Sequence, residues 1–111
     1  MNKAFYRFYE KQEWTYRTVQ IENNLYSKLK YISEQELDTS ISKLVDACVE
    51  NFEIKGNKIV YYKKSDDEIT IKASIRLRQT MWDKLEKMRV KYDVSIQKLV
   101  NMAIKYTLDN E

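Results

Sequence analysis

The sequence predicts a small α+β protein, mainly helical, in which one strand-helix-helix unit occurs twice. Residues 40–45 read Ser-Ile-Ser-Lys-Leu-Val and residues 95–100 read Ser-Ile-Gln-Lys-Leu-Val, so five of six positions recur. Matching residues are 56 positions apart before the turn between the two helices of each unit and 55 apart after it. The one-residue length change therefore falls in a turn, where it disturbs the fold least. Within each copy the apolar period changes from two to about 3.6, which is typical of a strand followed by helices.

The two copies are expected to share one core. The chain has 111 residues, of which 43% are hydrophobic, whereas a unit of roughly 45 residues seldom buries enough apolar surface alone. The repeats are therefore expected to pair, either with each other or with those of another chain.

Residues 1–14 are predicted to form an aromatic N-terminal arm. Phe5, Phe8 and Tyr9 have helical spacing. One interpretation is a short helix or arm that packs on the domain. The other is an aromatic surface through which these three residues contact a protein partner.

The first repeat covers residues 15–52 and begins with a strand. Val19 and Ile21 would face inward, and Arg17 at an inward position suggests that the strand frays or bends at its start. The outward side chains would be Tyr16, Thr18 and Gln20. Leu25, Leu29 and Ile32 then mark one face of a helix. Ser40 is the expected N-cap of a second helix, with apolar positions at Ile41, Leu44, Val45, Cys48, Val49 and Phe52.

Residues 53–68 join the repeats. Phe52-Glu-Ile-Lys and Lys-Ile-Val-Tyr-Tyr62 flank Gly56-Asn57, which suggests a β-hairpin with a two-residue turn. If extended, the segment reaches roughly 50 Å, and a tether of this length gives a local concentration on the order of millimolar. Pairing of the repeats within one chain is therefore expected.

The second repeat covers residues 69–111 and follows the same order. Its inward strand positions are expected to be Ile69, Ile71, Ala73, Ile75 and Leu77, and they alternate with Thr70, Lys72, Ser74 and Arg76. Met81, Leu85 and Met88 mark the first helix, and Ser95 is the expected N-cap of the second. The apolar face of that second helix comprises Ile96, Leu99, Val100, Ala103, Ile104 and Leu108.

The composition argues against catalysis. The chain has no histidine, one cysteine (Cys48) and one glycine (Gly56). Zinc sites and the common nucleophile and base pairs depend on His or Cys, and a loop that cradles phosphate needs several glycines. Cys48 lies on a predicted apolar helix face, where it is expected to be a small core residue. We therefore expect no enzymatic activity, no metal and no cofactor.

Charge and hydropathy set broader limits on partners. The formal net charge is +3, and residues 68–111 hold nine Lys/Arg against six Asp/Glu. This surplus is compatible with a polyanionic partner, although a solvated lysine-rich surface gives the same count. No apolar run approaches the length of a membrane span, so we expect a cytoplasmic protein without a membrane partner.

A polar-outward strand, followed by a helix and a serine-capped second helix, resembles the ribbon-helix-helix family of DNA-binding proteins of the Arc and MetJ type. The resemblance covers residues 15–52 and 69–108, and two units in one chain are also found in TraY-type relaxosome proteins. In this family two units pair their strands into a two-stranded antiparallel ribbon that lies in the DNA major groove. The resemblance implies that this chain is an intramolecular pseudodimer with one such ribbon and four helices. The resemblance implies duplex DNA as the partner, with side-by-side self-association on DNA.

The resemblance also implies which residues contact DNA. By position, the base-reading side chains would be Tyr16, Thr18 and Gln20 on one strand and Lys72, Ser74 and Arg76 on the other. Arg and Lys donate to guanine, Gln pairs with adenine, and Thr contacts a thymine methyl group. Phosphates would be held at the second-helix N-termini by Ser40, Ser42 and Lys43 and by Ser95, Gln97 and Lys98. Because the triads differ, we expect a non-palindromic site whose half-site under the second repeat is the richer in G·C.

The expected function is thus site-specific binding of double-stranded DNA, in a transcriptional regulator or in a plasmid or phage accessory factor for the relaxosome or for partition. A second hypothesis keeps the same scaffold but makes the chain a protein-interaction module, such as an antitoxin or inhibitor. In that case the binding surface would be the aromatic arm or the linker hairpin.

Overall fold

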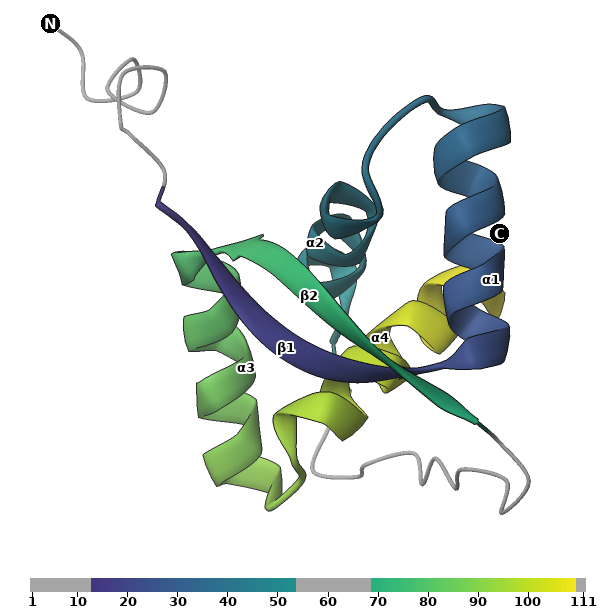
Figure 1. The fold of residues 1–111 in the computed structure, drawn as a ribbon. Helices are drawn as coiled ribbons and strands as arrows, with labels where there is room; N and C mark the ends of the chain where they lie inside the picture. Colours follow the sequence, from purple (N-terminus) through teal and green to yellow (C-terminus); the bar gives the residue numbers. More distant parts are fainter. Residues whose placement is uncertain (1–12, 54–68, 110–111) are drawn as a thin grey trace, which may run out of the picture.

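The computed structural model describes residues 13–53 and 69–109, and it shows an α+β fold that is mainly helical (Figure 1). The first range contains β1 (Trp14–Glu22), α1 (Asn23–Tyr31), the π-helical segment η2 (Ile32–Glu36) and α2 (Ile41–Asn51). The second contains β2 (Thr70–Arg78), α3 (Gln79–Tyr92) and α4 (Ile96–Asp109). The expected order of strand, helix and helix therefore occurs in both ranges. The predicted contacts of Phe5, Phe8 and Tyr9 and the predicted linker hairpin lie outside the described residues.

The two strands pair with each other in an antiparallel two-stranded sheet. Thr18 lies opposite Ser74 at its centre, with four further pairs on each side. These two residues are 74 − 18 = 56 positions apart, which equals the repeat offset, so an approximate twofold axis passes through the central pair.

One boundary of the predicted strands is wrong. Ile69 was expected to face inward, but β2 begins only at Thr70 and Ile69 is 72% exposed. Its carbonyl oxygen still accepts a hydrogen bond from the Asn23 amide at 2.7 Å. Ile69 therefore extends the backbone ladder without adding its side chain to the core.

The expected fraying of the first strand is also wrong, because Arg17 has partners on the inner face. Arg17 pairs in register with Ile75. Its guanidinium carbon lies 5.0 Å from the centre of the Trp82 ring, and its Nη1 atom lies 3.4 Å from Glu86 Oε1. A cation over an aromatic face is attracted by the ring quadrupole, which gives this inward arginine a stable position.

Serine caps begin α2 and α4, as predicted. Ser40 Oγ accepts a hydrogen bond from the Lys43 amide, and Ser95 Oγ accepts one from the Lys98 amide, each at 3.2 Å. Each bond satisfies a first-turn N–H that has no acceptor within the helix. Both second helices thus start at equivalent positions.

The one-residue length change falls in the turn before these caps. Together α1 and η2 cover 14 residues, 23–36, and α3 covers the equivalent 14, 79–92. The first turn then needs one residue more than the second. Asp38 and Asp93 adopt positive φ values of 46° and 54°, a conformation that Asp tolerates better than most residues, and so they occupy turns that lack glycine.

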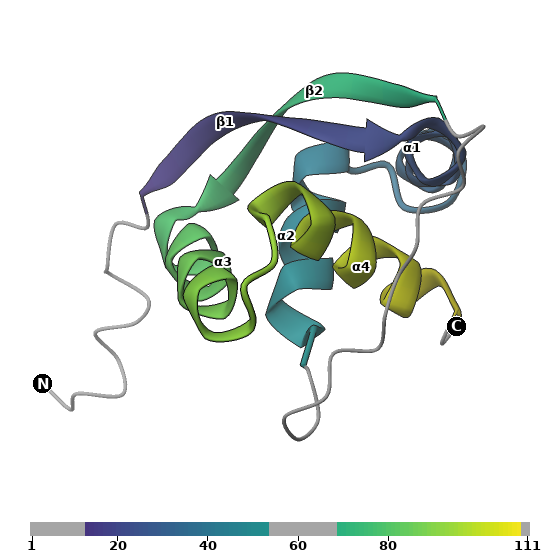
Figure 2. The same ribbon diagram turned by 90° about the horizontal axis from the view of Figure 1, so that it is seen from below.

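The core lies between the sheet and the helices. Figure 2 shows β1 and β2 as one layer above α2 and α4, with α1 and α3 at opposite ends. The inner faces of the strands and helices bury Val19, Ile21, Leu25, Leu29, Val45, Cys48, Val49, Phe52, Ala73, Ile75, Leu77, Leu85, Leu99, Val100, Ala103 and Ile104. Trp82 is fully buried as well, and the sequence pattern did not single it out.

Candidate nucleic-acid interface

The outer face of the two strands carries all six predicted base-reading side chains. They form three cross-strand pairs, namely Tyr16 with Arg76, Thr18 with Ser74, and Gln20 with Lys72. Five of the six are exposed and Gln20 is partly exposed. Alternation along a strand sends every second side chain to the same face, so the observed register brings the two triads together on one surface.

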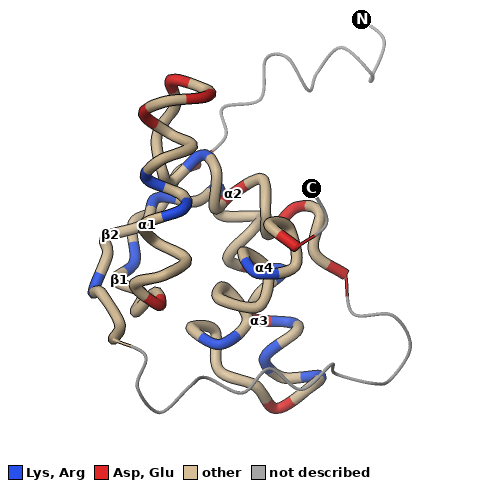
Figure 3. Tube along the Cα trace, turned by 90° about the vertical axis from the view of Figure 1, so that its right-hand side faces the viewer, with Lys and Arg blue, Asp and Glu red and all other residues tan. Residues whose placement is uncertain are grey.

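This outer face carries no exposed carboxylate. Glu22 is the one acidic residue in β1 and β2, and only 5% of its surface is exposed. Figure 3 shows Lys and Arg positions on the strands, whereas acidic positions cluster at η2, at the far end of α1. Of the described helices, α2 and α4 pack against the inner face of the sheet (Figure 2). Within residues 13–53 and 69–109, the outer face is therefore uncovered by any helix and, where charged, basic.

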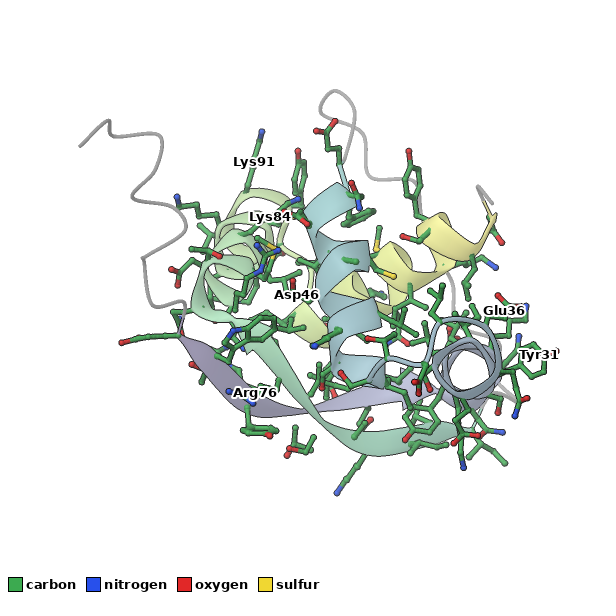
Figure 4. The ribbon with its side chains drawn as sticks, turned by 90° about the horizontal axis from the view of Figure 1, so that it is seen from above. Tyr31, Glu36, Asp46, Arg76, Lys84 and Lys91 are labelled. Carbon is green, nitrogen blue, oxygen red and sulfur yellow. The ribbon has the colours of Figure 1, made fainter. Side chains whose placement is uncertain are left out.

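Arg76 is the most constrained side chain on this face. Its guanidinium carbon lies 5.7 Å from the centre of the Tyr16 ring and 5.8 Å from that of the Trp14 ring. Its backbone N–H donates to Ser42 Oγ at 2.9 Å. Figure 4 shows Arg76 on the side of the strands that faces away from α2. Contacts with two rings orient the guanidinium before any ligand arrives.

The two ends of the sheet present different pairs of side chains. Antiparallel pairing puts Arg76 and Tyr16 at one end and Lys72 and Gln20 at the other. Each end thus combines side chains from both strands. A half-site beneath either end would therefore be contacted by side chains of both strands, which the sequence pattern could not show without the direction of pairing. Among the described residues, no aromatic ring contact holds Lys72 in the way that two rings hold Arg76.

Two of the residues predicted to contact phosphate accept hydrogen bonds from the edges of the sheet. Ser42 Oγ accepts from the Arg76 amide, and Gln97 Oε1 accepts from the Gln20 amide at 2.8 Å. In an antiparallel ladder only every second pair of residues directs its amides toward the partner strand. The amides of Gln20 and Arg76 belong to the other pairs and point away from the partner strand. Ser42 and Gln97 thus fix α2 and α4 against the two edges of the sheet.

The remaining predicted phosphate contacts lie at the starts of α2 and α4. The oxygens of Ser40 and Ser95 accept the capping hydrogen bonds, and Lys43 and Lys98 are exposed one position beyond the edge-binding residues. The first-turn amides and the positive end of the helix dipole favour an anion here. Because Ser42 and Gln97 hold these helix starts against opposite edges, the two sites flank the outer face.

One buried carboxylate joins α2 to the end of β2. Asp46, 6% exposed, accepts from the Arg78 amide at 3.0 Å, and its Oδ2 atom lies 2.8 Å from both Nε and Nη2 of the Arg78 guanidinium. Glu50 Oε1 lies 3.3 Å from Nη2. Hydrogen bonding to Asp46 is the main reason why the pKa of Arg78 is raised. This network locks the guanidinium in its charged form.

One buried amide makes the equivalent connection between α4 and β1. Asn101 Oδ1 accepts from the Glu22 amide at 3.0 Å, and Asn101 Nδ2 donates to the carbonyl oxygen of Gln20 at 2.9 Å. Nδ2 also lies within 2.8 Å of the Gln97 carbonyl oxygen. Each second helix therefore holds the strand of the other repeat.

Sequence reasoning did not identify Trp14, Asp46 or Asn101 as part of this framework. A usable signal was present for the last two. Both are polar residues on otherwise apolar helix faces, and they occupy the same position in the two repeats, since 101 − 46 = 55. A buried polar residue needs a hydrogen-bonding partner, so a polar pair at equivalent positions predicts a specific contact.

Two other kinds of site find no support in residues 13–53 and 69–109. No helix there is long and apolar enough to cross a membrane, and no three His, Cys, Asp or Glu side chains are grouped to hold a metal ion. The chain matches no protein-family model, no curated protein sequence and no solved structure.

Proposed function

We propose that the chain is a tandem ribbon-helix-helix protein that binds double-stranded DNA at specific sites. In this proposal β1 and β2 form the ribbon that enters the major groove, which is wide enough to admit two strands. The observation that carries the proposal is the outer face of the sheet, which is open and free of exposed carboxylates and has an oriented arginine at one end. Regulation of transcription, or an accessory role in a plasmid or phage, would use this activity.

In this proposal the outer face of the sheet contacts bases, and the starts of α2 and α4 contact phosphates. Arg76 is oriented to donate to guanine O6 and N7, while Lys72 and Gln20 at the opposite end suit guanine and adenine. Lys43 and Lys98, at the capped helix starts, would contact phosphates and set the register on the duplex. The ends differ in chemistry, so the proposed site is non-palindromic.

Selection from a random pool of duplex DNA at moderate salt tests the function directly. We expect a non-palindromic consensus with an invariant guanine beneath the Arg76 end. The reason is that Arg76 is held by two rings while Lys72, at the opposite end, is not. Failure to enrich any consensus would contradict site-specific binding, and a perfect inverted repeat would contradict the unequal roles of the ends.

Substitutions at one end of the sheet should separate base reading from phosphate binding. Arg76→Ala is expected to cost about 1–3 kcal/mol on the selected site and to relax preference at one base pair. Lys43→Ala should weaken all sequences alike and reduce the slope of log K against log salt by about 1. Both effects are measurable by fluorescence anisotropy over a salt series.

Lys91→Ala is the matched control for these two variants. It removes one positive charge from the end of α3, where Figure 4 shows the side chain pointing away from the strands. The two variants lose the same net charge, but Lys43 lies at the capped start of α2 and Lys91 points away from the strands. Lys91→Ala should therefore change affinity less than Lys43→Ala does. Equal losses for Lys91→Ala and Lys43→Ala would mean that net charge, rather than position, governs binding.

A further inference from the structure

We infer that charged residues at the ends of the ribbon determine which repeats can pair, so that a first repeat pairs with a second repeat and neither pairs with its own kind. The inference concerns the partner that each strand selects and does not depend on DNA binding. It rests on the contacts between the strand ends and the second helices. Figure 4 shows one of the residues involved, Asp46, on α2.

These contacts form two equivalent sets. Asp46 accepts from the backbone amide of Arg78, and Asn101 accepts from the backbone amide of Glu22, each at 3.0 Å. Arg78 and Glu22 differ by the strand offset of 56, and Asn101 and Asp46 differ by the second-helix offset of 55. The same hydrogen bond, from a strand-end amide to a side chain of the second helix, is therefore made twice. The acceptor is Asp46 in one set and Asn101 in the other.

The charges in the two sets are complementary across the repeats. The Arg78 guanidinium meets two carboxylates, Asp46 at 2.8 Å and Glu50 at 3.3 Å. At the equivalent strand position, the carboxylate-bearing Glu22 is 5% exposed beside the neutral Asn101. Lys105 on α4 stands where Glu50 stands on α2, since 105 − 50 = 55. A cationic strand end thus meets an acidic helix, whereas an acidic strand end meets a neutral amide. The helix that carries this amide also carries Lys105, which lies 4.0 Å from Asp109.

Pairing of like repeats from two chains would reverse this complementarity. Two first repeats would place the buried Glu22 against the buried Asp46 of the other copy, with the half-exposed Glu50 beside them. Buried like charges disfavour each other's ionisation and destabilise the contact. A pair of first repeats is therefore disfavoured.

Two second repeats would meet a different obstacle. Arg78 would face Asn101 and Lys105 of the other copy, so a partly buried guanidinium would lose both carboxylates and gain a cation as neighbour. Breaking an ion pair by removing one partner is more costly than never having formed it. Both like pairings carry an explicit repulsive element, which is how specificity against wrong partners is achieved.

The selection should act between chains as well as within one. Two chains that exchange repeats would still form two ribbons of one first and one second strand. Every ribbon would then present the same pair of unequal ends. The linker between the repeats favours pairing within one chain. It does not favour unlike over like repeats once two chains have exchanged them, whereas the charges do.

The central pair of the ribbon offers a direct reporter. Thr18 faces Ser74, and the hydrogen-bonded pairs are odd-numbered in β1, as the bond from the Asn23 amide to Ile69 shows. Thr18 and Ser74 thus form a non-hydrogen-bonded pair, whose Cα atoms lie about 4.5 Å apart, close enough for a disulfide. In a ribbon of two first repeats, Thr18 would instead face its own copy. In a Cys48→Ala background, Thr18→Cys should therefore link two chains only when like repeats pair.

Gln20→Cys, in the same background, is the matched control. Gln20 lies on the same face, but in a ribbon of two first repeats it would face residue 16 rather than its own copy. It therefore reports disulfides that form by random collision. The informative quantity is the excess of covalent dimer from the Thr18→Cys chain over that from the Gln20→Cys chain, read on a non-reducing gel.

The decisive comparison equalises the charges of the two repeats. Asp46→Asn, Glu50→Lys and Arg78→Glu together give the first helix and the second strand the same residues as their counterparts. The chains are refolded from denaturant at about 1 mM, where a second chain competes with the tether, and are then oxidised. We expect no excess dimer with the native charges, and at least about tenfold more dimer with equalised charges.

Equal amounts of excess dimer with native and equalised charges would overturn the inference. So would the absence of excess dimer in both backgrounds, because contacts other than these charges would then determine pairing. Far-UV circular dichroism checks that each chain refolds. If the first equalised chain does not fold, Glu22→Arg, Asn101→Asp and Lys105→Glu equalise the repeats in the opposite sense, and the same comparison applies.

Discussion

Replacing Trp82 by alanine is expected to lower the free energy of unfolding by about 3–5 kcal/mol, because the indole is fully buried and its loss leaves a large cavity. Two specific contacts would go with it. The indole Nε1 donates to the Thr15 carbonyl oxygen at 2.8 Å, and the ring supports the Arg17 guanidinium. Urea denaturation followed by far-UV circular dichroism measures the change.

Tyr26→Ala is the control for this substitution. Tyr26 occupies the equivalent position in the first repeat, since 82 − 26 = 56, but it is only partly buried. It should therefore cost less than Trp82→Ala. A loss of less than about 1 kcal/mol in the free energy of unfolding of Trp82→Ala would contradict the buried position of the ring. Removal of a buried indole leaves a cavity that the surrounding side chains can fill only in part.

Asp46→Ala is expected to destabilise the fold by about 3 kcal/mol, because it removes the buried main partner of a partly buried guanidinium and the acceptor of the Arg78 amide. A raised arginine pKa contributes stability below the unfolded-state pKa, and this contribution is lost as pH rises through the folded-state pKa. The guanidinium is therefore fully charged near neutral pH, where the measurement should be made.

Glu50→Ala separates the buried contact from the exposed one. Glu50 lies 3.3 Å from the same guanidinium, but its side chain is 54% exposed, and exposed ion pairs typically contribute about 0–1 kcal/mol. Its loss should cost much less than that of Asp46. Similar losses in the free energy of unfolding for the two variants would show that the burial of Asp46 does not make its contact with Arg78 stronger than that of Glu50.

Local features of the fold were predictable from the sequence because each depends on neighbouring residues. Alternation identified the inner positions Val19, Ile21, Ile75 and Leu77, and the serine caps of the second helices were placed correctly. The repeat offset also located the turn with the extra residue. A hydrophobic period and a helix N-cap can each be recognised within a short stretch of sequence, so these predictions needed no knowledge of the fold.

The candidate interface was predictable only in part. Alternation correctly placed the two polar triads outward, but the grouping into ends required the antiparallel register. Trp14 was not recognised as a partner of Arg76, because the two residues are 62 positions apart and meet only through strand pairing. The DNA-binding role of this surface stays a prediction.

The repeat, the order of the elements, most of their inward faces and the caps of the second helices could be read from the amino-acid sequence. Which polar residues meet, such as Asp46 with Arg78 and Asn101 with Glu22, became visible only in the folded structure. A periodic pattern reports that a residue faces the core, but not which residue lies opposite it there. That choice depends on the register of two strands and the docking of two helices, which residues far apart in the chain determine together.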